Sequence, residues 1–213
     1  MAPDTERTWG GTTLEDRRAT RRVQLLDAGL ELLGTSGAAS VTVRGVCRAA
    51  QLTERYFYES FADRDALLIA VHARVAEEAR AAIADAVAAA PSDPLASASA
   101  AVGAFVDLLQ DDPRRGRVLL EEVFADEQLT RAGVDLIPSF AALLAEQIAA
   151  SFGTGPGGPD RLDARLTSVA LVGALAHLFS GWLDGTIAVT RERLVAHVVA
   201  LILAAAPVSS RES

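Results

Sequence analysis

The chain has 213 residues, 50% of them hydrophobic, and a formal net charge of −8, with 20 Lys and Arg against 28 Asp and Glu. All 20 basic residues are Arg, which excludes lysine-based chemistry. The single Cys excludes an internal disulfide framework and indicates a reducing compartment. This length and composition suit one large or two small domains with a sizeable core.

The N-terminal segment, residues 1 to 16, carries acids and no apolar core, so we expect a disordered arm rather than a signal peptide. Arg17, Arg18, Arg21 and Arg22 then precede or open the first helix. Two interpretations stay open for these arginines. In one, the arginines lie along a phosphate backbone, and in the other they form a solvated charge run.

Residues 41 to 65, VTVRGVCRAAQLTERYFYESFADRD, are the most informative segment. Thr42, Thr53 and Asp63 each stand just before a run able to form a helix, and their side-chain oxygens can accept the unpaired N–H groups of its first turn. Two short helical runs with a three-residue break between them are typical of a helix-turn-helix that presents its second helix to DNA.

The apolar residues of this segment predict a small core. They are Val43, Val46, Cys47 and Ala50 on one face of the first short helix, closed by Leu52, Phe57 and Phe61 beyond the turn. Cys47 is accordingly interpreted as a core residue rather than a redox switch. Thr42, Arg44 and Arg48 fall away from the buried face.

Burial of the two phenylalanines leaves polar side chains around the N-terminal half of the second helix, namely Thr53, Arg55, Tyr56 and Tyr58. An arginine can make two hydrogen bonds to a guanine edge, and Tyr and Thr hydroxyls can bond phosphate oxygens. The N-terminus of a helix also favours an anion. The pattern therefore indicates a DNA-binding protein.

With the helix before it, this stretch resembles the tetracycline-repressor (TetR) family of bacterial transcription regulators, over roughly residues 17 to 75. The residues that carry the resemblance are Leu25, Leu26, Ala28, Leu32, Leu33, Gly37, Thr42, Val43, Ala50, Leu52, Thr53, Tyr58, Phe61 and Leu67. The resemblance implies a three-helix DNA-binding head followed by a larger all-helical body.

The resemblance also implies roles for individual residues. Phosphate contacts are expected from Thr42, Thr53 and Tyr58, and from Arg64 at the start of the fourth helix. Base contacts are expected from Arg55 and Tyr56, and Arg44 completes the expected DNA-binding set.

Three departures from the family's pattern concern the operator sequence. Gln51 stands at a turn position where the family usually has glycine, and a positive φ there carries a steric cost. Gly45 weakens the first short helix by up to about 1 kcal/mol relative to Ala. Arg55 and Tyr56 replace smaller residues, which changes the surface offered to bases.

Charge is distributed unevenly along the chain. Residues 17 to 64 hold eight Arg against five acids, whereas residues 65 to 213 hold eleven Arg against nineteen acids. The expected head is therefore mildly basic. Glu54 and Glu59 on the second short helix would repel phosphates unless turned away or paired with a cytosine amine, so we expect modest non-specific affinity for DNA.

The body is predicted to begin with a long helix from Asp63 to about Ala90 that faces the core with Leu67, Val71, Val75, Ala79 and Ala82. Helical spacing continues over residues 95 to 110, about 114 to 125 and about 127 to 152. Pro138 predicts a kink or a break near Leu136. Glu121, Glu122 and Asp126 are interpreted as a solvated acidic face.

Two further helices are predicted at residues 161 to 184 and 191 to 206, and both are apolar nearly all round. A helix with two apolar sides must be covered on both. Each run falls short of the roughly 20 apolar residues that span a bilayer and carries His177 or His197, so a membrane role is not expected. The resemblance implies a homodimer with a four-helix interface built from these two segments.

An effector pocket is also implied by the resemblance. The bulky residues of the body are Phe105, Leu109, Phe124, Phe140, His177, Phe179 and Trp182. Each one taken alone is a core residue, but the family binds a small molecule among these helices and then releases DNA. We therefore expect a hydrophobic or aromatic effector at Phe105, Leu109, Phe124, Phe140, His177 and Trp182, with His177 or Trp182 as polar handle.

No catalytic, cofactor or metal motif is found in the sequence. Gly153, Gly155 and Gly158 spell GxGxxG, but the run follows a helix rather than a strand and lacks a βαβ setting. No Cys and His cluster has zinc spacing. We therefore expect neither an enzyme nor a cofactor.

The sequence as a whole predicts an all-α fold of about nine helices, divided into an arm (1–16), a DNA-binding domain (17–64), an effector-binding and dimerisation domain (65–206) and a tail (207–213). The predicted function is a cytoplasmic, ligand-responsive repressor that binds a palindromic operator as a dimer. Two alternatives stay open. One is a helical small-molecule-binding protein or enzyme with a vestigial head, and the other is an adaptor that joins a different chain through its terminal helices.

Overall fold

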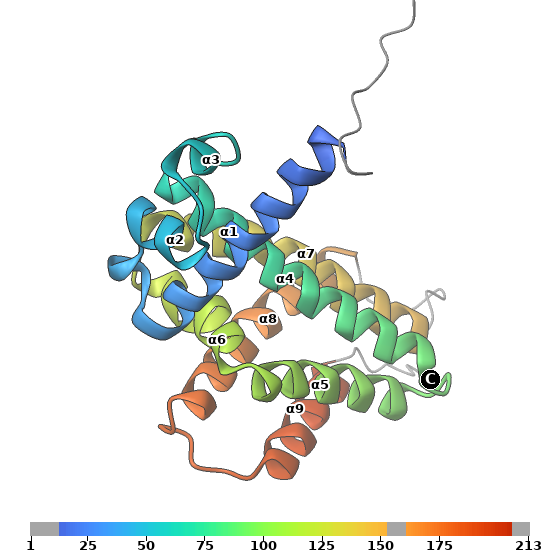
Figure 1. The fold of residues 1–213 in the computed structure, drawn as a ribbon. Coiled ribbons are helices and arrows are strands. Elements are labelled where there is room, and N and C mark those ends of the chain that lie inside the picture. The colour runs from blue at the N-terminus through green and yellow to red at the C-terminus, as the bar shows by residue number, and fades with distance from the viewer. Residues whose placement is uncertain (1–12, 153–160, 206–213) are drawn as a thin grey trace, which may run out of the picture.

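The computed structural model describes the backbone of residues 13–152 and 161–205, and within these ranges the side chains up to residue 144 and from residue 165. All regular elements of the described residues are helices, which confirms the all-α fold (Figure 1). The elements are α1 (Leu14–Ser36), η1 (Ala38–Ser40), α2 (Val43–Ala49), α3 (Glu54–Tyr58), α4 (Arg64–Ala89), α5 (Pro94–Asp111), α6 (Pro113–Gly116), η2 (Arg117–Glu121), η3 (Glu122–Phe124), α7 (Glu127–Phe152), α8 (Arg161–Leu183) and α9 (Arg191–Ala205).

Helix α1 begins earlier than the sequence suggested. The Thr13 hydroxyl accepts the Asp16 N–H at 3.1 Å, and the Asp16 carboxylate accepts the Thr13 N–H at 2.9 Å, which is a complete capping box. Residues 14 to 16 are therefore helical, and the expected arm is wrong for them. Residues 1 to 12, the C-terminal tail and the glycine-rich run 153–160 lie outside the described residues.

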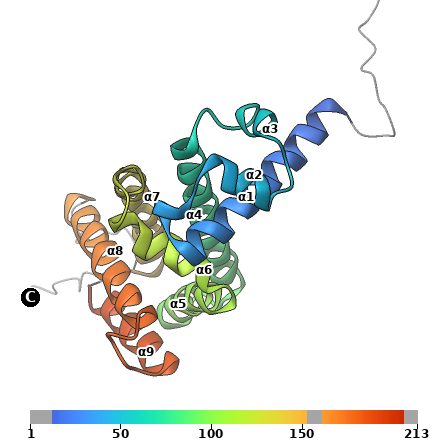
Figure 2. The ribbon, with the colours of Figure 1, turned by 60° about the vertical axis from the view of Figure 1, so that its left-hand side comes forward.

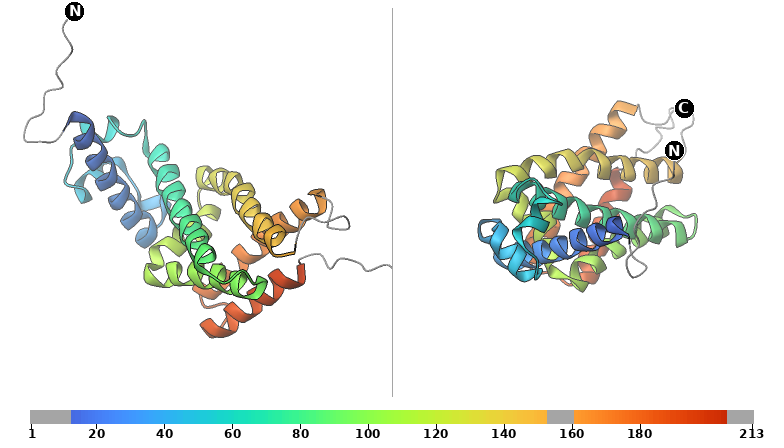
Figure 3. Two further views of the ribbon diagram at one scale, coloured as in Figure 1. Left: turned by 90° about the vertical axis from the view of Figure 1, so that its right-hand side faces the viewer. Right: turned by 45° about the horizontal axis from the view of Figure 1, so that its top comes forward.

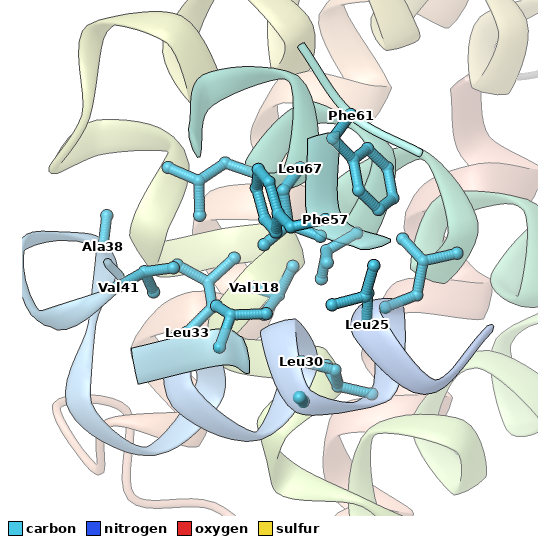
Figure 4. Packing of buried hydrophobic residues seen from close by; sticks show 14 of the residues in the cluster. Leu25, Leu30, Leu33, Ala38, Val41, Phe57, Phe61, Leu67 and Val118 are labelled. Carbon is cyan, nitrogen blue, oxygen red and sulfur yellow. The ribbon is translucent and has the colours of Figure 1, made fainter. Parts of the chain in front are cut away.

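The head is formed by α1, α2, α3 and the start of α4 around the core seen in Figure 4. Leu25, Leu33, Phe57 and Leu67 are fully buried there. Cys47 is buried as predicted, and burial raises the pKa of its thiol, so it stays an unreactive core residue. The first turns of α1 contain no buried residue and project away from α8 and α9 (Figure 2).

Helix α4 connects the head to the body. Its 26 residues span about 39 Å, and the views in Figure 3 show it running from the head along the body. Its first half buries Leu67, Val71 and Val75 in the head core, and Ala79 belongs to the body core. The predicted core-facing positions of this helix are therefore confirmed.

The segment after α5 departs from the predicted regular helix. Only Pro113–Gly116 form an α-turn, followed by a π-turn over Arg117–Glu121 (η2) and a 3₁₀ turn over Glu122–Phe124 (η3). A π-turn holds more residues per turn, so it changes which side chains face each neighbour. Val118 from η2 joins the head core, with Leu129 from α7. Head and body therefore share one packed boundary.

Helix α7 runs from Glu127 to Phe152 through Pro138, so the helix does not break near Leu136, and the alternative of a kink stays a prediction. One missing N–H is tolerated because α7 packs along α4 and α8, which stabilises the helix on both sides of the proline. Helices α8 and α9 complete the body, and α5 packs against both α4 and α9 (Figure 1).

Candidate DNA-binding surface and effector cavity

The helix-turn-helix is built from local signals. The Thr42 hydroxyl accepts the Gly45 N–H at 3.0 Å and so begins α2. Thr53 begins α3 without a side-chain cap bond and is exposed. Gln51 in the turn has φ of 55°, the only positive φ at a non-glycine residue in the described part of the chain. The left-handed turn expected at this position is therefore present, although glycine is not.

Three predicted DNA contacts lie on the open side of this motif. Arg44 and Arg55 have side chains that are 89% and 84% exposed, and Tyr58 is also exposed. Tyr56 is half-buried, with the Arg21 guanidinium 4.3 Å above its ring centre. Arg55 and Tyr58 are thus more accessible than Tyr56 in the free protein.

The acids of α3 are not turned away from these arginines. Glu54 Oε1 lies 3.1 Å from Arg44 Nε. Glu59 Oε1 lies 3.2 Å from Arg55 Nε. The contact between Arg44 and Glu54 is exposed on both sides and therefore weak, so a phosphate can displace the carboxylate at little cost. Glu59 is less exposed, and its Oε2 also lies 3.5 Å from Arg21 Nη2. Pairing with these acids reduces the positive charge of Arg44 and Arg55, which is consistent with the modest non-specific affinity that we expect.

The arginines on α1 divide into two groups. Arg22 donates from Nη1 to the Ser60 carbonyl at 2.8 Å, and its guanidinium stacks over Phe61. Arg21 stacks over Tyr56, as noted, and these two arginines tie α1 to the end of α3. Arg17 and Arg18 lie on the projecting turns, where both earlier interpretations stay open.

Arg64 is not placed as a phosphate ligand. Its Nε donates to the Val41 carbonyl at 2.8 Å, and its Nη2 donates to the Ala38 carbonyl at 2.5 Å. Nη2 also lies 3.4 Å from Asp126 Oδ2. Arg64 is thus the donor to the Val41 carbonyl and a second donor to the Ala38 carbonyl, which also accepts the Val41 N–H at 3.1 Å. Its guanidinium is therefore used within the protein, so we withdraw Arg64 from the expected DNA contacts. The other six residues stay predictions.

A second buried charge holds the same loop. Glu122 is 5% exposed, and its Oε2 accepts the Ala38 N–H at 2.7 Å. Its Oε1 accepts from Arg117 Nε at 3.0 Å, and Arg117 also donates to the Thr35 carbonyl at 2.8 Å. The interpretation of Glu122 and Asp126 as a solvated face is therefore wrong, because both serve the boundary between head and body.

The body contains a cavity of about 230 Å³. Its wall is formed by α4, α5, η2, α7, α8 and α9, and it includes Phe105 and Phe140 from the predicted effector set. The wall also includes His72, Leu119, Leu120 and Phe179. A single water needs only about 10 to 15 Å³ by such a measure, so the cavity has room for a small molecule.

Four residues of the expected effector set do not line this cavity. Leu109 is buried in the body core, and Phe124 is 77% exposed. Trp182 Nε1 already donates to the Val189 carbonyl at 3.1 Å, and His177 lies on the exposed side of α8. Neither His177 nor Trp182 can therefore offer a polar group to a ligand in the cavity. His72 is a polar residue that does line it.

Sequence reasoning missed His72 although a signal was present. His72, Ala76, Ala79 and Ile83 recur at three- and four-residue spacing and mark a second buried face of α4. His72 is 2% exposed, and burial lowers the pKa of its imidazole to about 4. Its Nδ1 has no hydrogen-bond partner. Among the described residues, no cluster of His, Cys, Asp or Glu is suited to hold a metal ion.

Helix α8 has an unusual surface. Over Arg165–Leu183 it is long and apolar enough to cross a membrane by length and composition alone, with a mean hydropathy of 1.6, and only 11% of that window is buried. One such helix is weak evidence for a membrane role.

Helix α3 begins after Thr53 and lies on the outside of a compact head on a helical body, which is the arrangement of a helix-turn-helix (Figure 1). Residues 25–71 match the family model described as bacterial regulatory proteins, tetR family. The matched segment contains the helix-turn-helix formed by α2 and α3. No curated protein sequence matches the chain.

Solved structures share the fold over nearly the whole chain. The fatty acid degradation regulator FadR from Bacillus halodurans is 18% identical, with a TM-score of 0.68 over 91% of this chain and 97% of its own. A TetR-like transcriptional regulator from Rhodococcus sp. RHA1 is 19% identical, with a TM-score of 0.62 over 87% and 94%. The regulator FadR from Bacillus subtilis in complex with stearoyl-CoA is 14% identical, with a TM-score of 0.66 over 86% and 97%.

Proposed function

We propose that this regulator is a ligand-responsive repressor of the cytoplasm that binds a palindromic operator as a homodimer and leaves DNA when a small, largely apolar effector fills the body cavity. The observation that carries this proposal is the π-turn η2, which contributes to the cavity and to the head at once. Leu119 and Leu120 line the cavity, whereas Val118 between α6 and these residues packs in the head core.

On the DNA side, each head places α3 in a major groove. Arg55 and Tyr56 then face base edges, and Thr42, Thr53 and Tyr58 face phosphates. Arg44 exchanges its Glu54 partner for a phosphate. In a dimer these contacts are doubled, and the distance between two α3 helices selects operators with the matching half-site spacing.

Effector binding is coupled to DNA binding through the boundary between head and body. An occupant that presses on Leu119 and Leu120 displaces η2, and with it the neighbouring Glu122 that holds Ala38. The loop of residues 38 to 41 leads directly into the cap of α2. Effector binding thereby favours a head position that cannot fit both grooves.

The apolar character of the effector is supported by the cavity wall and by one relative. The structure of FadR from Bacillus subtilis contains stearoyl-CoA, a ligand with a long hydrocarbon chain. A wall of Leu, Phe, Val and Ile side chains from α4 to α9 suits a hydrocarbon or aromatic group in the same way.

The homodimer is supported by the exposed sides of α8 and α9. Exposed positions recur with helical spacing at Leu166, Val169, Ala170, Gly173, Ala174 and His177 in α8, and at Ala196, His197, Ala200, Leu201 and Ala204 in α9. A Cβ added at Gly173 would meet nothing within 4 Å. Small and apolar side chains along two adjacent helices let a second copy approach closely and bury both faces.

The repressor mechanism is tested by filling the cavity from within. Operator duplexes are first selected from a random library with the full-length protein. Ala98 lines the cavity, so Ala98→Phe should mimic an occupant and lower operator affinity at least tenfold in an anisotropy titration. Ala88→Phe on the exposed side of α4 is the control and should leave affinity unchanged. A folded Ala98→Phe protein with normal affinity would contradict the coupling.

The dimer is tested by placing a charge on α8. Val169→Glu should convert the dimer to a monomer in sedimentation, because a carboxylate would be buried at the interface without a partner. Val134→Glu adds the same charge at an exposed residue of α7 and should leave the dimer intact. A wild-type monomer, or equal effects of both changes, would refute this interface.

A further inference from the structure

The cavity is nearly free of polar side chains. Of the described residues in its wall, only His72 from α4 and Ser97 from α5 have polar side chains, and none is charged. The Ser97 hydroxyl donates to the Pro91 carbonyl at 3.4 Å, so it has a partner within the protein. His72 differs because its buried Nδ1 has no partner.

An unpartnered imidazole in an apolar wall is costly unless something supplies the missing hydrogen bond. His72 is 2% exposed and lines the cavity, so a molecule bound in the cavity can supply the missing partner. A neutral imidazole offers one donor and one acceptor, and it therefore suits a hydroxyl or a carbonyl group.

A charged ligand head is disfavoured by the same surroundings. An ion moved from water into a wall without counter-charges loses its hydration without compensation. Burial holds the pKa of His72 at about 4, so at neutral pH the side chain brings no positive charge to meet a carboxylate.

We infer that the cavity binds an uncharged, mainly hydrocarbon ligand whose single polar group, a hydroxyl or a carbonyl, hydrogen-bonds to His72. This inference rests on the proposed effector cavity and narrows the class of effector. The hydrogen bond falls on α4, one residue from Val71 in the head core, so the polar group of the ligand acts on the helix that joins the two cores.

The test uses three probes of equal chain length, 1-decanol, decanoate and decylamine, each below its micelle concentration at pH 7.5. Binding to the full-length protein is measured by displacement of the neutral dye N-phenyl-1-naphthylamine. Decanol should bind at least tenfold more tightly than either ion. Because an alcohol enters any apolar site more readily than an ion does, the deciding measurement is made on variants.

His72→Leu should weaken decanol binding about tenfold, the value of one lost buried hydrogen bond, while dye binding stays within about twofold. Ser99→Ala is the control and should leave both unchanged, because Ser99 lies on α5 outside the cavity wall and its hydroxyl donates to the Leu95 carbonyl. Decanoate binding as tightly as decanol, or an unchanged decanol affinity in His72→Leu, would overturn the inference and leave the cavity as a ligand site. Failure of the dye and all probes to bind would overturn the proposed effector cavity itself.

Discussion

His72 illustrates how a single side chain makes stability depend on pH. Its pKa in the folded protein is about 4, against 6.5 for an exposed imidazole, because burial disfavours the charged imidazolium. As pH falls below 6.5 the unfolded chain takes up a proton that the folded chain refuses until about pH 4. The stabilisation is therefore complete above pH 6.5 and is lost on the way down to pH 4.

We expect this effect to be visible in urea unfolding at fixed protein concentration. Between pH 7.5 and pH 5, wild type should lose about 2 kcal/mol more of its free energy of unfolding than His72→Leu does. Equal losses in the two proteins would mean that His72 is solvated or already paired.

Gln51 carries the second residue-scale prediction. Its φ of 55° is costly for a side chain branched at Cβ, so Gln51→Val should lower the free energy of unfolding by about 1 to 2 kcal/mol. Gln51→Gly should be neutral or stabilising by up to about 1 kcal/mol. The control is Gln110→Val on the exposed side of α5, which should cost only about 0.5 kcal/mol. A loss at Gln51 no greater than at Gln110 would mean that the turn relaxes.

Among the elements, α2 and α3 carry the surface that we expect to face DNA together with its counter-charges. Glu54 pairs with Arg44, and Glu59 pairs with Arg55, so two acids neutralise the arginines that we expect at the DNA. These pairs lower the attraction to any phosphate backbone and leave base contacts to distinguish one duplex from another.

Removing one acid should therefore loosen selectivity. Glu54→Gln is expected to raise affinity for random duplex about threefold at low salt, with the difference shrinking as salt rises. Glu77→Gln, an exposed acid on α4 beyond the head, is the control and should change little. A decrease in random-duplex affinity for Glu54→Gln would show instead that Glu54 positions Arg44 for binding.

Elements differed in how far their sequence predicted them. Thr42 and Asp63 can be recognised as helix starts because a cap needs only a side chain and an N–H three residues away. Thr53 also marks a helix start, although its side chain makes no cap bond. The π- and 3₁₀-turns after Gly116 have no such local signature. Their formation depends on which side chains of this short segment pack in the head and which line the cavity. These contacts are made with residues far away in the chain.

For the whole molecule, the boundary between head and body determines how the helix-turn-helix is held. Arg64 and Glu122 together bind the carbonyl and the N–H of Ala38, and Arg64 also reaches Asp126. The loop before α2 is thus held from the long helix and from the segment beside the cavity. Movement of either element changes the position of the helix-turn-helix.

We expect Arg64→Ala to act on stability rather than on phosphate binding. It leaves the Val41 carbonyl without its donor and removes one donor from the Ala38 carbonyl and from Asp126, so the free energy of unfolding should fall by about 1 to 3 kcal/mol. The salt slope of random-duplex binding should stay as in wild type, whereas Arg44→Ala should reduce it by about one unit per head. A shallower slope for Arg64→Ala would return Arg64 to the DNA surface.

The sequence alone determined the helical fold, the capped helix-turn-helix, its core of Val46, Cys47, Phe57 and Phe61, and the exposed polar strip beside it. These features depend on neighbours within one or two helical turns, where spacing and chemistry can be read directly. Tertiary structure decided the rest, since Ala38 meets Glu122 across 84 residues and Arg64 meets Asp126 across 62. It also decided that His72, and neither His177 nor Trp182, stands in the cavity, because which face of a helix meets an open space depends on the packing of all six elements around it.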